Sequence, residues 1–145
     1  MHEGLALLLT ILAAAPAAAT EDDRTAVEAV VKAAYVDGVH AAFDPQAMRK
    51  GFDPAFRMQV LRDGTITSLT LEEWIERMEK SARENPAPTP VVRHEFKLVD
   101  VTGTAAVARV ELWRDGRHMF TDYLSLYKRP DGWKIAAKTF YAHPK

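Results

Sequence analysis

Residues 120–141 read FTDYLSLYKRPDGWKIAAKTFY, and this stretch decides the fold. Both halves are rich in the aromatic and β-branched residues that favour strands, and between them Pro130 and Gly132 suit a turn. The pattern predicts a β-hairpin in which Lys128 pairs with Trp133. Since side chains alternate along a strand, this register places Asp122 on one face of the sheet and Lys138 on the other.

Two further turn signals extend the sheet towards the N-terminus. Asp115-Gly116 and Thr102-Gly103 each match a two-residue hairpin turn. The sequence therefore predicts a meander of four strands, over residues 91–101, 104–114, 117–128 and 133–141. Pairing through these turns places Arg109 opposite Asp122 and His94 opposite Glu111.

The first half of the chain predicts helices that cover one face of this sheet. Apolar residues recur at helical spacing over 21–43, Asp44-Pro45 starts a short helix over 45–50, and Asp63-Gly64 closes a hairpin. Thr70 and Glu73 form a capping box that starts a third helix, which ends near the proline-rich residues 86–90. Helices first and strands last indicate one α+β domain, with three N-terminal helices packed on a curved antiparallel sheet.

The predicted face that carries Asp122 combines apolar and polar side chains, as small-ligand cavities do. At its polar end the register gathers eight candidate ligand-binding residues: His94, Phe96, Arg109, Glu111, Trp113, Phe120, Asp122 and Tyr141. Arg109 and Asp122 are expected to form a partly buried ion pair. Asp122 and His94 are also the candidate catalytic residues, because a carboxylate or imidazole in an apolar cavity can act as a general base.

Structural roles for the same residues stay open. A cross-strand salt-bridge network would equally account for Arg109, Glu111 and Asp122, and His94 would then be a buried histidine bonded to Glu111. His40, one turn before Phe43, has two alternatives: it faces the mouth of the pocket or, as we prefer, it occupies a solvated helix position. The opposite sheet face is expected to expose an apolar patch through which two copies of the chain pair, made of Ala106, Ala108, Val110, Leu112, Met119, Thr121, Tyr123 and Phe140.

Composition and motif content exclude several classes of protein. The chain has 145 residues, 48% of them hydrophobic, which suits one soluble domain. It has no cysteine, and its 5 histidines show neither H-x-x-x-H nor H-x-H spacing, so we expect no metal and no other cofactor. Its 19 Lys and Arg residues against 20 Asp and Glu give no basic excess, which argues against a nucleic-acid partner.

Residues 1–19 have the pattern of a secretory signal peptide. An apolar run over 5–15 is followed by Pro16 and by Ala17-Ala18-Ala19, an A-x-A cleavage pattern. The run is too short to span a bilayer, which takes roughly 20 apolar residues. We therefore expect cleavage after Ala19, a mature domain over 20–145, a periplasmic or secreted location, and no membrane association after cleavage.

Four motifs together resemble one family. They are Tyr35-Val36-Asp37-Gly38, Arg62-Asp63-Gly64-Thr65, residues 70–74 and the long motif over 120–140. With them the chain resembles the putative lumazine-binding proteins of the nuclear-transport-factor-2-like (SnoaL-like) superfamily. This resemblance implies a cone-shaped α+β fold, a pocket inside the cone and frequent dimers through the outer sheet face. Related enzymes, the polyketide cyclases and ketosteroid isomerases, use a pocket Asp in acid–base catalysis, for which Asp122 is the nearest candidate here.

Three functions are open at this point. The preferred one is an exported, non-catalytic protein that binds a planar or aromatic small molecule through the eight candidate residues. The second is an isomerase or cyclase that uses Asp122 or His94 as its general base. The third is a dimeric interaction module without a ligand. We expect a homodimer in addition to the small-molecule ligand of the preferred function.

Overall fold

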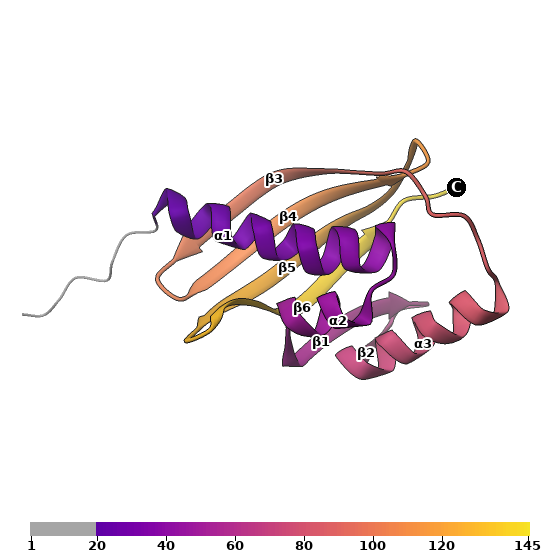
Figure 1. The fold of residues 1–145 in the computed structure, drawn as a ribbon, viewed down its shortest axis with the longest axis horizontal. Helices are drawn as coiled ribbons and strands as arrows, with labels where there is room; N and C mark the ends of the chain where they lie inside the picture. The colour runs from indigo at the N-terminus through magenta and orange to yellow at the C-terminus, as the bar shows by residue number, and fades with distance from the viewer. Residues whose placement is uncertain (1–19) are drawn as a thin grey trace, which may run out of the picture.

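The computed structural model describes residues 20–145, and in it one long helix lies across the sheet (Figure 1). Helix α1, Glu21–Val31, begins at Thr20, whose hydroxyl accepts a hydrogen bond from Asp23 N. Acidic residues in its first turn favour the positive end of the helix dipole. The chain continues directly as a π-helix, η1, Lys32–Ala41. The long predicted helix is therefore confirmed, and it ends at residue 41.

The π-helical winding of η1 changes which side chains face the sheet. In an α-helix a residue five positions further along lies off the starting face, whereas the i→i+5 hydrogen bonds of a π-helix bring it back into line. Tyr35 and His40 are five positions apart, and their rings meet edge to face with centroids 4.9 Å apart. Both side chains are buried, so the solvated position expected for His40 is wrong.

The segment after the long helix contains two helices and a hairpin. Its elements are α2 (Pro45–Gly51), β1 (Phe52–Arg62), β2 (Thr65–Thr70) and α3 (Leu71–Glu84). Asp44 caps α2, because its Oδ1 accepts hydrogen bonds from the backbone N–H groups of Gln46 and Ala47. Thr70 and Glu73 form the predicted capping box at the start of α3.

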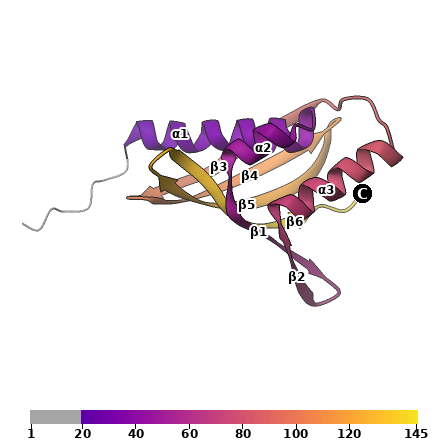
Figure 2. The same cartoon turned by 60° about the horizontal axis from the view of Figure 1, so that its bottom comes forward.

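Four further strands complete a curved six-stranded sheet: β3 (Val92–Thr102), β4 (Ala105–Arg114), β5 (Arg117–Arg129) and β6 (Gly132–Ala142). The strand order is β2-β1-β6-β5-β4-β3, and every pairing is antiparallel except β1 with β6. The helices lie on one side of this sheet (Figure 2), and no helix or strand of residues 20–145 covers its other side. The predicted α+β fold is confirmed, with one parallel pairing in place of an entirely antiparallel sheet.

Three of the four predicted turns have the predicted register. The pairs beside them are Lys128 with Trp133, Arg114 with Arg117, and Arg62 with Thr65. The fourth turn is shifted: Thr102 pairs with Ala105, so the turn residues are Gly103 and Thr104. Gly103 has a φ of 56°, a conformation that glycine adopts without strain.

Three bulges inside the strands each shift the register by one residue. Lys97 in β3, Met119 in β5 and Ala136 in β6 are extra residues without a partner directly opposite. A one-residue shift turns all the side chains beyond it to the other face of the sheet. As a result, the side chains that the sequence predicts beside Asp122 are distributed over both faces.

Ala108, Val110 and Leu112 show the effect of these shifts on the core. All three are fully buried on the side that the helices cover, although the sequence predicts them in an exposed patch on the other face. The predicted dimer patch is therefore wrong for these three residues, whereas another of its members, Tyr123, is exposed on the outer face. Fully buried side chains that share this core are Val27, Val31, Tyr35, Met48, Phe52, Phe56, Ile75, Leu124, Leu126 and Ile135.

The predicted signal peptide, residues 1–19, lies outside the described residues. Among the residues that are described, no helix is long and apolar enough to cross a membrane.

Candidate functional site

A cavity of about 600 Å³ lies between the end of the long helix, α3 and the sheet. The proline-rich residues 86–90 form part of its wall. Its apolar lining includes Val39, Phe43, Met58, Trp74, Met78, Phe120 and Phe140. A cavity of this size and composition suits a small organic ligand.

Lys138 reaches this cavity from β6 and is paired with the buried Asp122, which is bonded in turn to the buried Tyr35. Its Nζ lies 3.1 Å from Asp122 Oδ1, and the Tyr35 hydroxyl donates a hydrogen bond of 2.7 Å to Asp122 Oδ2. Asp122 is fully buried, and its Oδ1 has no partner besides Lys138. The three residues form a buried chain of polar groups in which Lys138 alone borders the cavity.

Aromatic rings surround the amino group of Lys138. The Nζ atom lies 4.4 Å from the ring centre of Phe140, 4.7 Å from that of Tyr35 and 5.3 Å from that of Trp74. Phe120 follows at 5.7 Å. Ring faces attract a cation at these distances, and the rings also keep bulk water away from it. The ammonium group is thus held in an apolar setting that strengthens its interaction with any ligand acceptor.

Burial acts against charge in this group. Desolvation raises the pKa of Asp122 and lowers the pKa of Lys138, although the attraction between the two groups opposes both shifts. Burial, together with the carboxylate of Asp122, raises the pKa of Tyr35 well above its ordinary value. The Tyr35 hydroxyl therefore stays protonated and keeps donating to Asp122.

His40 and Arg114 also border the cavity. The Nε2 atom of His40 is buried without a hydrogen-bond partner, and so is the Nε atom of Arg114. Burial, with the positive charges of Lys138 and Arg114 nearby, lowers the pKa of His40 to about 3. His40 is therefore neutral at physiological pH, and its Nε2 can accept or donate a hydrogen bond depending on the tautomer.

Among residues 20–145, the charged side chains that line the cavity are all cations. Lys138 and Arg114 contribute cations, and within residues 20–145 no Asp or Glu borders the cavity. Asp122 stands behind Lys138 and does not contact the open space. This arrangement can orient an anionic group or a carbonyl oxygen, while the aromatic walls pack against a planar body.

Four of the eight predicted binding residues lie on the helix-facing side of the sheet. Phe120 lines the cavity, and Asp122 is buried behind Lys138. Phe96 packs against the hydrophobic core, and the His94 ring meets it edge to face with centroids 5.4 Å apart. Neither Phe96 nor His94 borders the cavity. His94 stands opposite Leu112, so its predicted pairing with Glu111 is wrong.

The other four predicted residues, Arg109, Glu111, Trp113 and Tyr141, lie on the outer face. Arg109 stands opposite Tyr123, and its Nη2 donates a hydrogen bond of 3.0 Å to Glu111 Oε1. The predicted pair of Arg109 with Asp122 is therefore wrong. The error arises from the extra residue Met119. The turn sets the pairing only as far as Trp113 with His118, and beyond Met119 every residue of β4 pairs one position further along β5 than predicted.

Sequence reasoning missed Lys138 and Tyr35 as residues of the site, and it named the pocket mouth only as the second alternative for His40. The predicted register puts Lys138 on the outer face, and the bulge at Ala136 turns it inward. Local sequence offers no signal for that bulge, since two consecutive alanines fit either face of a sheet. The apolar spacing around Tyr35 and His40 is also compatible with an ordinary α-helix and does not reveal the π-helical winding.

Comparisons with known proteins agree with this fold. A family model described as "Putative lumazine-binding" matches residues 22–141. An NTF2-like protein of unknown function from Shewanella baltica OS155 is 24% identical, with a TM-score of 0.72 over 89% of this chain and 100% of that one. A second NTF2-like protein of unknown function, from Silicibacter pomeroyi DSS-3, is 22% identical, with a TM-score of 0.68 over 87% of this chain and 100% of that one. No curated protein matches the chain.

Proposed function

This chain belongs to the family described as putative lumazine-binding, and from that premise we propose that it binds one small planar molecule in the cavity beside Lys138. The flat body of the ligand packs against the aromatic walls, and an oxygen acceptor or anionic group lies against the Lys138 amino group. One observation carries the proposal: the buried cationic side chain of Lys138 borders a cavity that has no carboxylate in its lining within residues 20–145.

A pteridine-2,4-dione of the lumazine type fits this chemistry. Its ring system is flat, and its two carbonyl oxygens accept hydrogen bonds. Lys138 and Arg114 both have N–H groups that donate to such oxygens. The Nε2 atom of His40, which has no hydrogen-bond partner, can donate to an unprotonated ring nitrogen of the ligand or accept from a protonated one, depending on the tautomer. Trp74 and Phe120 supply ring faces for packing. The family description and the lining residues thus support the same chemical class of ligand.

Fluorescence titration with lumazine tests the proposal. The double variant Lys138→Met with Asp122→Asn removes the amino group and its buried counter-charge together, which keeps the core free of an unpaired charge. We expect it to bind lumazine roughly 10- to 100-fold more weakly, because a hydrogen bond from a charged donor contributes about 1.5 to 3 kcal/mol. Lys97→Met, which removes an exposed lysine of the outer face, is the matched control. Equal affinity of the double variant and the wild type would overturn the proposal.

An acid–base enzyme has less support. Asp122, the first candidate base, is bonded to Tyr35 and Lys138 and does not border the cavity, and His94 does not border it either. His40 does border it, but a group with a pKa of about 3 is a weak base at neutral pH. We therefore propose binding without catalysis, for which recovery of chemically unaltered lumazine after incubation is the check.

We also propose that the protein is exported and pairs with a second copy. The pattern of residues 1–19 supports export, and an intact mass that begins at Thr20 is the expected result for the exported protein. Tyr123, Tyr127 and Tyr141 are exposed on the outer sheet face, and aromatic side chains of this kind are common at interfaces. Sedimentation as a monomer at micromolar concentration would contradict the pairing.

A further inference from the structure

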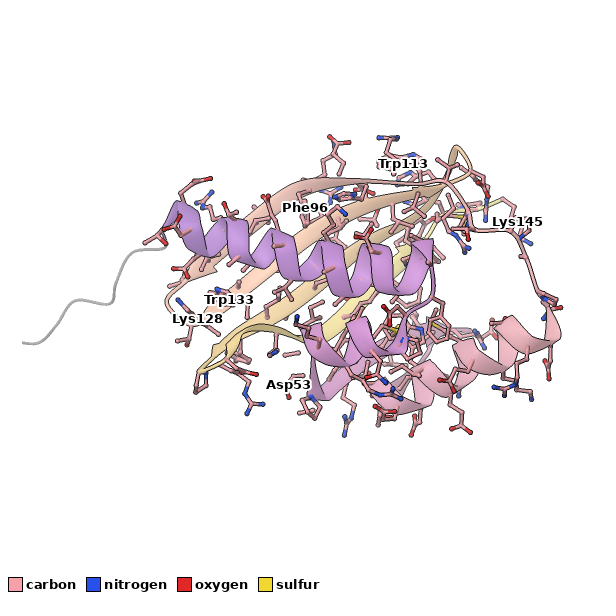
Figure 3. All side chains as sticks on the ribbon, in the orientation of Figure 1. Asp53, Phe96, Trp113, Lys128, Trp133 and Lys145 are labelled. Atoms are coloured by element: carbon pink, nitrogen blue, oxygen red, sulfur yellow. The ribbon has the colours of Figure 1, made fainter. Side chains whose placement is uncertain are left out.

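The outer face of the sheet carries a cluster that the cavity does not use. Glu111 in β4, His118 in β5 and His143 just beyond β6 each place one possible ligand atom within 4.8 Å of the other two. They meet at the end of the sheet where Figure 3 shows Trp113 and Lys145. We propose that these three side chains bind a divalent transition-metal ion, for which Zn²⁺ is the natural probe.

Glu111 is the buried member of the cluster, with 6% of its side chain exposed, and its two oxygens have different partners. Oε1 accepts a hydrogen bond of 3.0 Å from Arg109, whereas Oε2 lies 2.8 Å from His118 Nε2 and accepts a hydrogen bond from the Thr121 hydroxyl. Arg109 and Thr121 thus fix the orientation of the Glu111 carboxylate, and its Oε2 lies beside His118.

The two histidines approach this oxygen differently, because His118 contacts it directly and His143 does so through the Thr121 hydroxyl. His143 Nε2 lies 2.9 Å from the Thr121 hydroxyl, which itself contacts Glu111 Oε2. The His118 and His143 rings are stacked, with centroids 3.7 Å apart. Trp113 also stacks on His118, with ring centroids 4.6 Å apart. Both histidines are half-buried, so an ion can reach them from solvent. Because an imidazole binds a metal through a lone pair in the plane of its ring, the two stacked rings have to tilt apart for both to bind one ion.

The donor set decides which ions fit. Two imidazoles and one carboxylate form a site typical of Zn²⁺ and of other divalent transition metals, with the remaining positions open to water. Mg²⁺ and Ca²⁺ prefer oxygen ligands alone. Around an ion with bonds of about 2.0 to 2.1 Å, neighbouring ligand atoms lie roughly 3 to 3.5 Å apart. The contact of 2.8 Å between His118 and Glu111 therefore has to open only slightly.

The three residues have no recognisable spacing in the sequence, which explains why motif reasoning predicts no metal. Glu111 lies in β4, His118 in the neighbouring β5, and His143 follows the end of β6. The register between β4 and β5 brings Glu111 opposite Thr121 only because of the bulge at Met119. The Thr121 hydroxyl then bridges to His143, which follows the end of β6. The site is thus a product of strand pairing, on the face of the sheet opposite to the cavity.

Calorimetric titration of the tag-free protein with Zn²⁺ is the first test. We expect saturation at about one ion per chain at pH 7.5 and no binding of Mg²⁺ under the same conditions. His118→Ala and His143→Ala should each weaken binding by more than about 100-fold, since even partners outside the coordination sphere contribute about 10- to 100-fold. His94→Asn is the matched control, because His94 lies on the other face of the sheet and should leave Zn²⁺ affinity unchanged.

Co²⁺ supplies a second readout that does not depend on these variants. Its visible absorption bands report the ligand geometry, and a bound Co²⁺ ion next to His118 should quench the fluorescence of Trp113, which stacks on that ring. Trp113→Phe should remove most of this quenching. The absence of saturable Zn²⁺ binding up to about 1 mM, or binding that survives both histidine replacements, would overturn the proposal. Lumazine binding at the cavity should be the same in all these variants, so the two proposals can fail independently.

Discussion

Replacing Lys138 with Met tests the buried polar chain next to the cavity. Met has a similar length but no charge, so the packing is largely kept while Asp122 loses its counter-charge. Removing one partner of a buried ion pair costs about 3 to 5 kcal/mol. The control Lys97→Met breaks a pair with Glu95 in which the two side chains are 44% and 46% exposed, and such pairs contribute about 0 to 1 kcal/mol. At pH 7 we therefore expect Lys138→Met to lower the free energy of unfolding by about 3 to 5 kcal/mol. Lys97→Met should lower it by about 0 to 1 kcal/mol.

The cost of Lys138→Met should depend on pH in a defined direction. Burial already raises the pKa of Asp122 above its ordinary value of 3.8, and the loss of Lys138 removes an opposing effect. The folded variant then keeps a proton on Asp122 that the unfolded chain releases, so the stability of the variant falls as the pH rises above 3.8. The deficit should therefore be smallest in acid and largest where the folded state also loses the proton. Adding Asp122→Asn removes the titrating group and should flatten this dependence.

Urea denaturation from pH 4 to pH 8, followed by tryptophan fluorescence, measures these effects as a double-mutant cycle. The expected result is strong coupling, with the double variant closer in stability to the wild type than Lys138→Met is. If Lys138→Met unfolds within about 1 kcal/mol of the wild type at pH 7, Lys138 behaves as an exposed residue and the reasoning is refuted. The same conclusion follows if the effects of the two changes are simply additive.

The remaining predictions concern His40 and the two faces of the sheet. The pKa of His40 falls from 6.5 to about 3 on folding, so below pH 6.5 the unfolded chain binds a proton that the folded protein does not bind. The free energy of unfolding should therefore decrease as the pH drops below 6.5, by up to roughly 1.4 kcal/mol per pH unit. His40→Gln should remove this part of the urea-denaturation profile, and an unchanged slope would show that His40 titrates normally. Ala108→Glu puts a charge into the core at a fully buried position and should abolish the cooperative thermal transition, whereas a folded variant would place Ala108 outside the core. Tyr123→Glu, at a position that is 45% exposed, should stay folded and sediment as a monomer; a dimer of this variant would move the pairing away from the outer sheet face.

The turns and helix caps follow from the sequence because their signals are local. Pro130 and Gly132 fix the last hairpin, and Asp115-Gly116 fixes the one before it, since few residues adopt the backbone angles that such turns need. The capping box at Thr70 places the start of α3 within one residue for the same reason. From these signals and the order of helices and strands, the α+β architecture could be derived without coordinates.

The membership of each sheet face was decided only by the tertiary structure. A bulge of one residue costs little free energy locally. It nevertheless moves every following side chain of that strand to the other face of the sheet. The bulge at Ala136 turns Lys138 into the cavity, and the bulge at Met119 separates Arg109 from Asp122 and brings Glu111 opposite Thr121. With these bulges in place, Ala108, Val110 and Leu112 lie in the core, where they belong to one cluster with residues of the distant helices. The free energy gained by this burial therefore depends on contacts that are far apart in the sequence. The sequence alone thus determined which elements form and where they turn, whereas long-range packing decided which side chains meet, because a turn specifies pairing only up to the first bulge.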